Sequence, residues 1–107
     1  MPFYLYQVGY TAAASRTLVE HPQNREDAAK SLIESLGGKL HSFFFAFGDY
    51  DLVLIAEMPD NVSAGAVSLA AASGGAFAKF HTTPLLTTAD SIKVMKKAQK
   101  AVYAPPQ

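Results

Sequence analysis

Three side chains that can exchange protons stand on predicted strands of this chain. Asp51 and Glu57 border a run of aliphatic residues, and His81 lies in the predicted strand Ala76–Leu86. A carboxylate buried between apolar surfaces has a raised pKa and can act as a general base, and histidine titrates near neutral pH, so these three are the candidate catalytic residues. The simpler interpretation, which we favour for the carboxylates, is structural. Asp51 would then bond turn amides, and Glu57 would form an ion pair across a dimer interface.

Five further residues are candidates for holding a ligand. The Tyr6 hydroxyl could orient a bound molecule, although such a tyrosine more often packs its ring and bonds a neighbour. Lys79 alternates in register with His81, so both would face a cleft if the small residues of their strand face the helices. Arg16 could hold an anion at the mouth of a cavity, or it is simply solvated. The full set of binding candidates is Tyr6, Ser42, Phe44, Lys79 and Arg16.

Several common kinds of site are absent from the sequence. There is no cysteine, which excludes disulfides, thiolate nucleophiles and thiolate metal ligands. The three histidines, His21, His41 and His81, show neither the H-x-H nor the H-x3-H spacing of metal ligands, so we predict no metal site. No Gly-x-Gly-x-x-Gly loop and no Gly-x-Ser-x-Gly elbow occurs, and we predict no bound cofactor.

Length and charge limit the class of protein further. The chain has 107 residues, half of them hydrophobic, which is enough for one domain spanning 1–107. Nine basic residues balance nine acidic ones, so no overall field attracts nucleic acid or an anionic membrane. Four lysines gather near the C-terminus, and we interpret them as a solvated helix face rather than a nucleic-acid or lipid contact. With no membrane-length apolar run and no signal-peptide pattern, we predict a cytoplasmic protein.

The order of predicted elements is β-α-β-β-α-β with a trailing helix. Ala12 to Glu20 could form a short helix, but Pro22 would stop it, so Thr11 to Pro22 is predicted as a long connection that could contain a helical turn. Apolar spacing at i, i+3, i+4 and i+7 predicts the first helix, which Asn24 caps and Gly37-Gly38 ends. Pro84 predicts that the last strand lies at an edge. The predicted strands are Phe3–Tyr10, Lys39–Phe47, Tyr50–Met58 and Ala76–Leu86, and the predicted helices are Asn24–Leu36, Val62–Ser73 and about 89–102, before a tail at 103–107. This order is typical of the ferredoxin-like α+β fold, a four-stranded antiparallel sheet with helices on one face.

The central hairpin has two contrasting faces. A two-residue turn at Gly48-Asp49 would place Phe47 opposite Tyr50 and His41 opposite Ala56, on an apolar face under the helices. The other face would carry Phe44, Val53, Ser42 and Ile55, with Leu40 opposite Glu57. No predicted element remains to cover this mixed face, and monomers rarely expose such a patch. We therefore expect a homodimer or higher oligomer formed through this face, with a cavity between two sheets.

The hairpin motif resembles that of the GYD-domain family. The likeness rests on Leu36-Gly37-Gly38-Lys39-Leu40, on Gly48-Asp49-Tyr50-Asp51 and on Glu57, and it extends over about Phe3 to Thr88, leaving the last helix as an individual extension. The resemblance implies a dimeric α+β barrel. Relatives in that wider fold group include cofactor-free monooxygenases, small-ring isomerases, haem-handling enzymes and simple binding or assembly domains, so it implies no single activity.

Two functions are therefore open. The first is a homodimeric barrel that binds a small hydrophobic or aromatic molecule between its sheets, with cofactor-free, monooxygenase- or isomerase-like catalysis as its enzymatic form. The second is a non-catalytic oligomerisation or regulatory module without a ligand. An RNA-recognition module shares the element order, but it stacks bases on aromatic residues of its central strands. Here the strand after the hairpin offers only aliphatic residues at its middle, and the net charge is zero.

Overall fold

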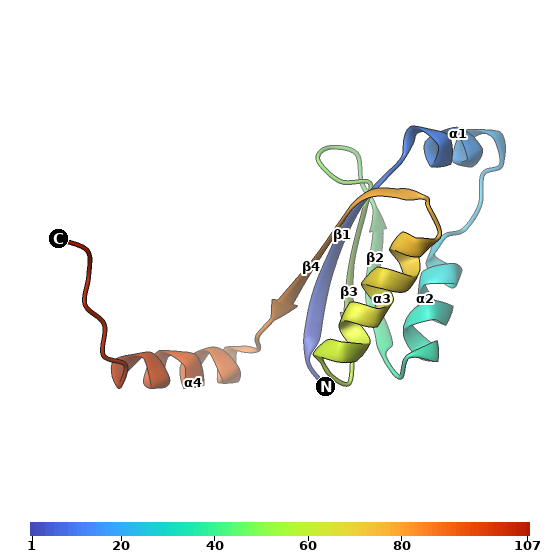
Figure 1. The fold of residues 1–107 in the computed structure, drawn as a ribbon. Helices are drawn as coiled ribbons and strands as arrows, with labels where there is room; N and C mark the ends of the chain where they lie inside the picture. The colour runs from blue at the N-terminus through green and yellow to red at the C-terminus, as the bar shows by residue number, and fades with distance from the viewer.

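One antiparallel sheet, with strands in the order β2-β3-β1-β4, forms the centre of the computed structural model, which describes residues 1–107 (Figure 1). Helices α2 and α3 cover one face of this sheet, and α1 stands at one end of it. The strands are β1 (Phe3–Tyr10), β2 (Lys39–Phe45), β3 (Leu52–Glu57) and β4 (Phe77–Leu85), and the helices are α1 (Ala12–Glu20), α2 (Glu26–Ser35), α3 (Asn61–Ser73) and α4 (Thr88–Gln99). The predicted ferredoxin-like α+β fold is confirmed, with β4 and its Pro84 at an edge as expected.

The core lies between the sheet and the two helices. Alternate residues of the two central strands point toward the helices, as the period of two in a strand requires. Tyr4 and Tyr6 of β1 are almost completely buried there, and their hydroxyls donate to Asn61 Oδ1 and to the Ala64 carbonyl at 3.1 Å. The buried hydrophobic residues are Tyr4, Tyr6, Val8, Ile33, Leu52, Leu54, Ala56, Met58, Ala64 and Val67.

Local signals set the ends of the helices that cover the sheet. Asn24 Oδ1 accepts from the backbone N–H groups of Glu26 and Asp27, at 2.9 and 3.3 Å, and so caps the first turn of α2. Gly37 follows α2 with φ of 84°, which a residue without a Cβ adopts freely. Asp60 caps α3 by accepting from the Ser63 N–H at 2.8 Å. Both helices therefore occupy the predicted stretches.

The predicted two-residue turn of the central hairpin is wrong. β2 ends at Phe45 and β3 begins at Leu52, and neither Gly48 nor Asp49 has a positive φ. Asp51 explains the difference, because it is tied to the end of β1: its N–H donates to the Val8 carbonyl, and its Oδ2 accepts from the Tyr10 N–H, both at 2.8 Å. These bonds pull the second half of the loop toward β1 and open the turn into a wider loop.

The predicted register is also wrong at the far end of the hairpin. The pairs Phe45–Leu52, Phe43–Leu54, Phe44–Val53 and Ser42–Ile55 form as expected. A bulge between Leu40 and Ser42 then places Leu40, and not His41, opposite Ala56 on the helix side. His41 instead approaches Glu57, with 3.4 Å between Nε2 and Oε2.

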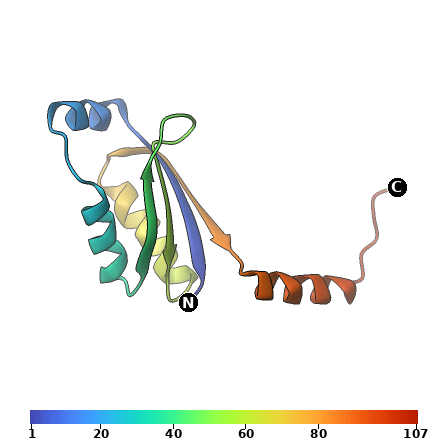
Figure 2. The same cartoon turned by 180° about the vertical axis from the view of Figure 1, so that it is seen from behind.

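Two connecting segments differ from expectation. Thr11 to Pro22 contains a nine-residue helix, α1, which begins where Thr11 Oγ1 accepts from the Ala14 N–H at 3.1 Å. Helix α4 ends at Gln99, short of the predicted Val102, and none of its residues is buried. Figures 1 and 2 show α4 leading away from the sheet and the other helices. The apolar side chains of α4, including Val94 and Met95, are therefore exposed.

No helix in the structure combines the length and the apolar character needed to cross a membrane.

Candidate functional site

The face of the sheet opposite α2 and α3 carries no other element of the chain (Figures 1 and 2). Its side chains form rows across all four strands, because the registers of the three strand pairs agree. We call this surface the open face. Its three rows are Phe44–Val53–Gln7–His81, Ser42–Ile55–Leu5–Thr83 and Lys39–Glu57–Phe3–Leu85. The open face is thus apolar at Val53 and Ile55 of β3 and in the middle of β1, and polar at Glu57 and along much of β4.

One aromatic and cationic cluster lies at an end of the open face. Tyr50, from the hairpin loop, reaches across β1 to β4, where the Lys79 ammonium lies 5.1 Å from its ring centroid. The His81 ring meets Tyr50 edge-on, with 5.4 Å between centroids. Gly9 is the β1 residue paired with Lys79, and a Cβ at that position would lie 3.0 Å from Lys79 Cγ, so the lysine side chain would have to shift. Lys79 and His81 are therefore brought together on the open face, whereas Thr82, one residue on, bonds Ser68 of α3 on the helix side.

The predicted alternation of β4 fails at one residue. Strict alternation would place Phe77 on the same side as His81, but the register shifts between Gly9 and Tyr10. Phe77 therefore lies on the helix side, where it stacks on Tyr10 at 5.2 Å and meets Phe80 edge-on at 5.5 Å.

The two candidate carboxylates each have a partner within the chain. Asp51 accepts the Tyr10 N–H, and Glu57 lies beside His41, whose ring also meets Phe3 edge-on at 5.2 Å. Asp51 and Glu57 stand at opposite ends of β3, so the structure does not bring them together. His81 is the candidate proton-transfer group that has no hydrogen-bonded or ionic partner in the chain.

The remaining candidates divide between the two layers. Ser42 and Phe44 lie on the open face, and the Phe44 side chain is well exposed. Tyr6 lies under α3 with no exposed surface, so it does not belong to the open face. The cause is the alternation of β1, which directs Leu5 and Gln7 outward instead. Arg16 is exposed on α1 and lines neither of the hollows beside that helix.

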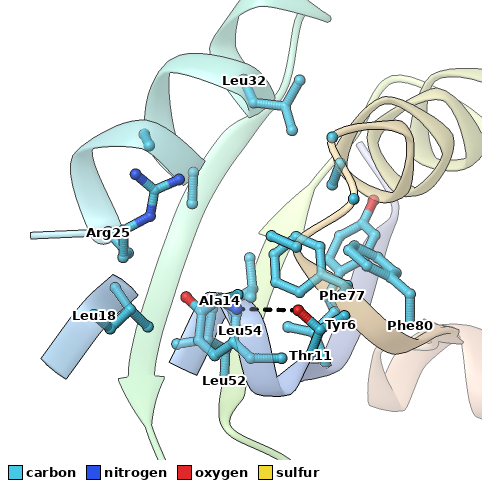
Figure 3. Close-up of a pocket in the computed structure, with 18 of the residues that line it drawn as sticks. Tyr6, Thr11, Ala14, Leu18, Arg25, Leu32, Leu52, Leu54, Phe77 and Phe80 are labelled. Carbon is cyan, nitrogen blue, oxygen red and sulfur yellow. Dashed lines mark hydrogen bonds between the residues drawn. The ribbon is translucent and has the colours of Figure 1, made fainter. Parts of the chain in front are cut away.

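A cavity that sequence reasoning missed lies on the helix side of the sheet. It measures about 510 Å³ and lies between α2 and α3, beneath α1. Figure 3 shows Arg25 and Leu18 on one side of this space and Phe77 and Phe80 on the other. Alanines line the helical walls: Ala13, Ala14, Ala28, Ala29 and Ala71. These alanines were the sequence signal that could have predicted the cavity, because small side chains on facing helices leave the space between the helices unfilled.

The fold and the open face define the class of protein: a ferredoxin-like α+β protein with one face of its sheet uncovered. A family model for the GYD domain matches residues 4–95, and the chain belongs to that family. The match includes the start of α4, so the prediction that the likeness ends near Thr88 is wrong. Residues 96–107 lie outside the match.

Comparison with solved structures supports the fold. The chain is similar to the crystal structure of MtbAldR, with a TM-score of 0.56 and 15% sequence identity. The alignment covers 80% of this chain and 52% of that one, so the chain spans about half the length of this relative. No curated protein matches the sequence.

Proposed function

We propose that two copies of this chain pack their open faces together into a closed barrel, and that the space between the sheets binds a small apolar or aromatic molecule. The open face itself carries this proposal. It is a continuous four-stranded surface with aliphatic residues at its centre, and no helix of the same chain covers it. A two-fold pairing would bury the aliphatic rows of both copies, as an apolar surface in water favours.

Helix α4 supports self-association independently. Ile92 and Met95 are exposed, and no residue of this helix is buried against its own chain. Isolated helices of this length are marginal in water, so α4 needs a surface to pack on. A second copy would supply one.

The polar groups of the open face favour a ligand between the sheets. Gln7 and His81 pair in the same row, and Tyr50 and Lys79 border them. A small number of such groups in an apolar surround is typical of small-molecule sites. His81, edge-on to Tyr50, would be the proton-transfer group in a cofactor-free enzyme of the monooxygenase or isomerase kind.

A ligand-free oligomerisation or regulatory module is the second candidate. It is favoured by the intrachain partners of Asp51 and Glu57, because a carboxylate already engaged by a backbone amide or a histidine is not free to act as a base.

Native mass spectrometry of the protein purified from its own host tests both proposals. We expect a dimer that retains a defined organic mass. The informative variant is Val53→Glu, which places a charge at the centre of the open face and should give a monomer. Val19→Glu is the matched control, since Val19 is exposed on α1, away from the open face.

The outcomes separate the proposals. A monomeric native protein at micromolar concentration, or a Val53→Glu variant that stays dimeric, would contradict self-association through this face. A dimer without extra mass would favour the ligand-free module.

A further inference from the structure

The cavity between α2 and α3 is separate from the open face, because the whole sheet stands between them. α2 packs chiefly against β2 and α3 against β4, so the two helices stand over opposite halves of the sheet. The cavity floor is formed by apolar side chains of the sheet, including Val8, Leu54 and Phe80. Its volume of about 510 Å³ lies within the range of about 300–1,000 Å³ that small-molecule sites occupy.

Arg25 is the one charged residue among those that line this cavity. Its Nη1 donates to Gln23 Oε1 at 2.9 Å, and no carboxylate lies within ion-pair distance of its guanidinium. Asp51 borders an adjacent hollow that Arg25 also lines, but its Oδ2 is engaged by the Tyr10 N–H. Arg25 is exposed, so its charge lies at the mouth of the cavity and not at its floor.

The other polar side chains of the wall are mostly engaged. Thr11 Oγ1 caps α1, Thr17 Oγ1 donates to the Ala13 carbonyl at 3.2 Å, and the Tyr6 hydroxyl donates to the Ala64 carbonyl. Tyr10 is different. Burial raises the pKa of its hydroxyl, with the Arg25 guanidinium opposing the rise and the Asp51 carboxylate adding to it, and the residue lines this cavity together with Arg25.

We propose that this cavity binds an amphipathic monocarboxylate, with its carboxylate on Arg25 at the mouth and its apolar body between α2 and α3. A guanidinium holds a carboxylate through two parallel hydrogen bonds, which a neutral or cationic head group cannot form. The Tyr10 hydroxyl also lines the cavity and provides a further donor, whereas Gln23 Nε2 already donates to the His21 carbonyl at 3.1 Å. The proposal is independent of dimerisation, since none of these residues belongs to the open face.

Calorimetric titration of the full chain with decanoate, decanol and decylamine tests the head-group requirement. The three probes share one apolar chain and differ in charge. We expect decanoate to bind at least about tenfold more tightly than decanol, and decylamine to bind more weakly than either, because a charge-assisted hydrogen bond contributes about that factor or more.

Two arginine variants provide the matched comparison. Arg25→Gln should weaken decanoate binding by about tenfold to a hundredfold and leave decanol binding unchanged. Arg16→Gln removes the same charge from the exposed side of α1 and should leave both unchanged. Backbone amide shifts on adding decanoate should fall on α1, the start of α2 and the end of α3.

The proposal is wrong if decanoate does not bind, if decanoate and decanol bind equally, or if Arg25→Gln and Arg16→Gln have equal effects. It is also wrong if the amide shifts gather on the open face or on α4. Amide shifts on the open face would assign decanoate to the space between two sheets, and amide shifts on α4 would indicate that α4 of a second copy competes for the cavity.

Discussion

Phe44 is the most informative single position for the proposed dimer. It lies on the open face of the edge strand β2, opposite Val53, and 66% of its surface is exposed. Because the ring makes no part of the buried core, Phe44→Ala should leave the folded monomer intact. Any effect on assembly is then an effect on the interface.

The magnitude follows from the exposed fraction. Burying a whole phenylalanine side chain contributes about 1.5–3 kcal/mol, so burying the exposed two-thirds contributes about 1–2 kcal/mol per copy. A two-fold dimer contains the position twice, which gives about 2–4 kcal/mol for the pair. At 1.4 kcal/mol per tenfold, the dimer dissociation constant should rise by about thirtyfold to several hundredfold.

Sedimentation equilibrium over nanomolar to micromolar concentrations measures this constant directly. Leu69→Ala is the matched control, because Leu69 is similarly exposed but lies on α3. It should leave the constant unchanged. A change of less than about threefold for Phe44→Ala would show that this part of the open face is not buried by self-association, and the reasoning from the uncovered sheet would fail.

Two further predictions concern stability and are measured by chemical and thermal unfolding. A Cβ at Gly38 would lie 2.5 Å from the Glu57 carbonyl oxygen, so Gly38→Ala should cost about 1–3 kcal/mol of unfolding free energy. Gly65 lies in α3, and a Cβ there would have no atom within 4 Å, so Gly65→Ala should instead stabilise the protein by up to about 1 kcal/mol. Equal effects of the two substitutions would contradict the packing at Gly38. Burial, with a smaller contribution from Tyr4, raises the pKa of Tyr6 from 10.0 to about 12. Between these pH values the folded state keeps a proton that the unfolded state loses. The free energy of unfolding should therefore fall as pH rises from about 10 to about 12. Tyr6→Phe should show a shallower fall, and an unchanged slope would mean that Tyr6 does not titrate differently in the two states.

The order of elements could be predicted because its signals are local. The alternation in β1, the apolar stripe of α2 and the turn at Gly37 each depend on neighbours within a few residues. The uncovered face of the sheet could be predicted because no predicted element remained to cover it, and the structure leaves this face uncovered. The site candidates were partly placed by the same alternation, which explains why Ser42, Lys79 and His81 lie on the open face while Tyr6 does not.

The tertiary structure decided everything that depends on distant partners. The hairpin loop opens because Asp51 binds an amide 41 residues before it, and the bulge next to His41 redirects that ring to Glu57. Neither contact has a signature within its own segment. The cavity beside Arg25 likewise exists because α2 and α3 pack on opposite halves of the sheet. A sequence determines which way each residue points along a strand or helix, but the register between strands and the space between helices are set by hydrogen bonds and packing that join remote parts of the chain.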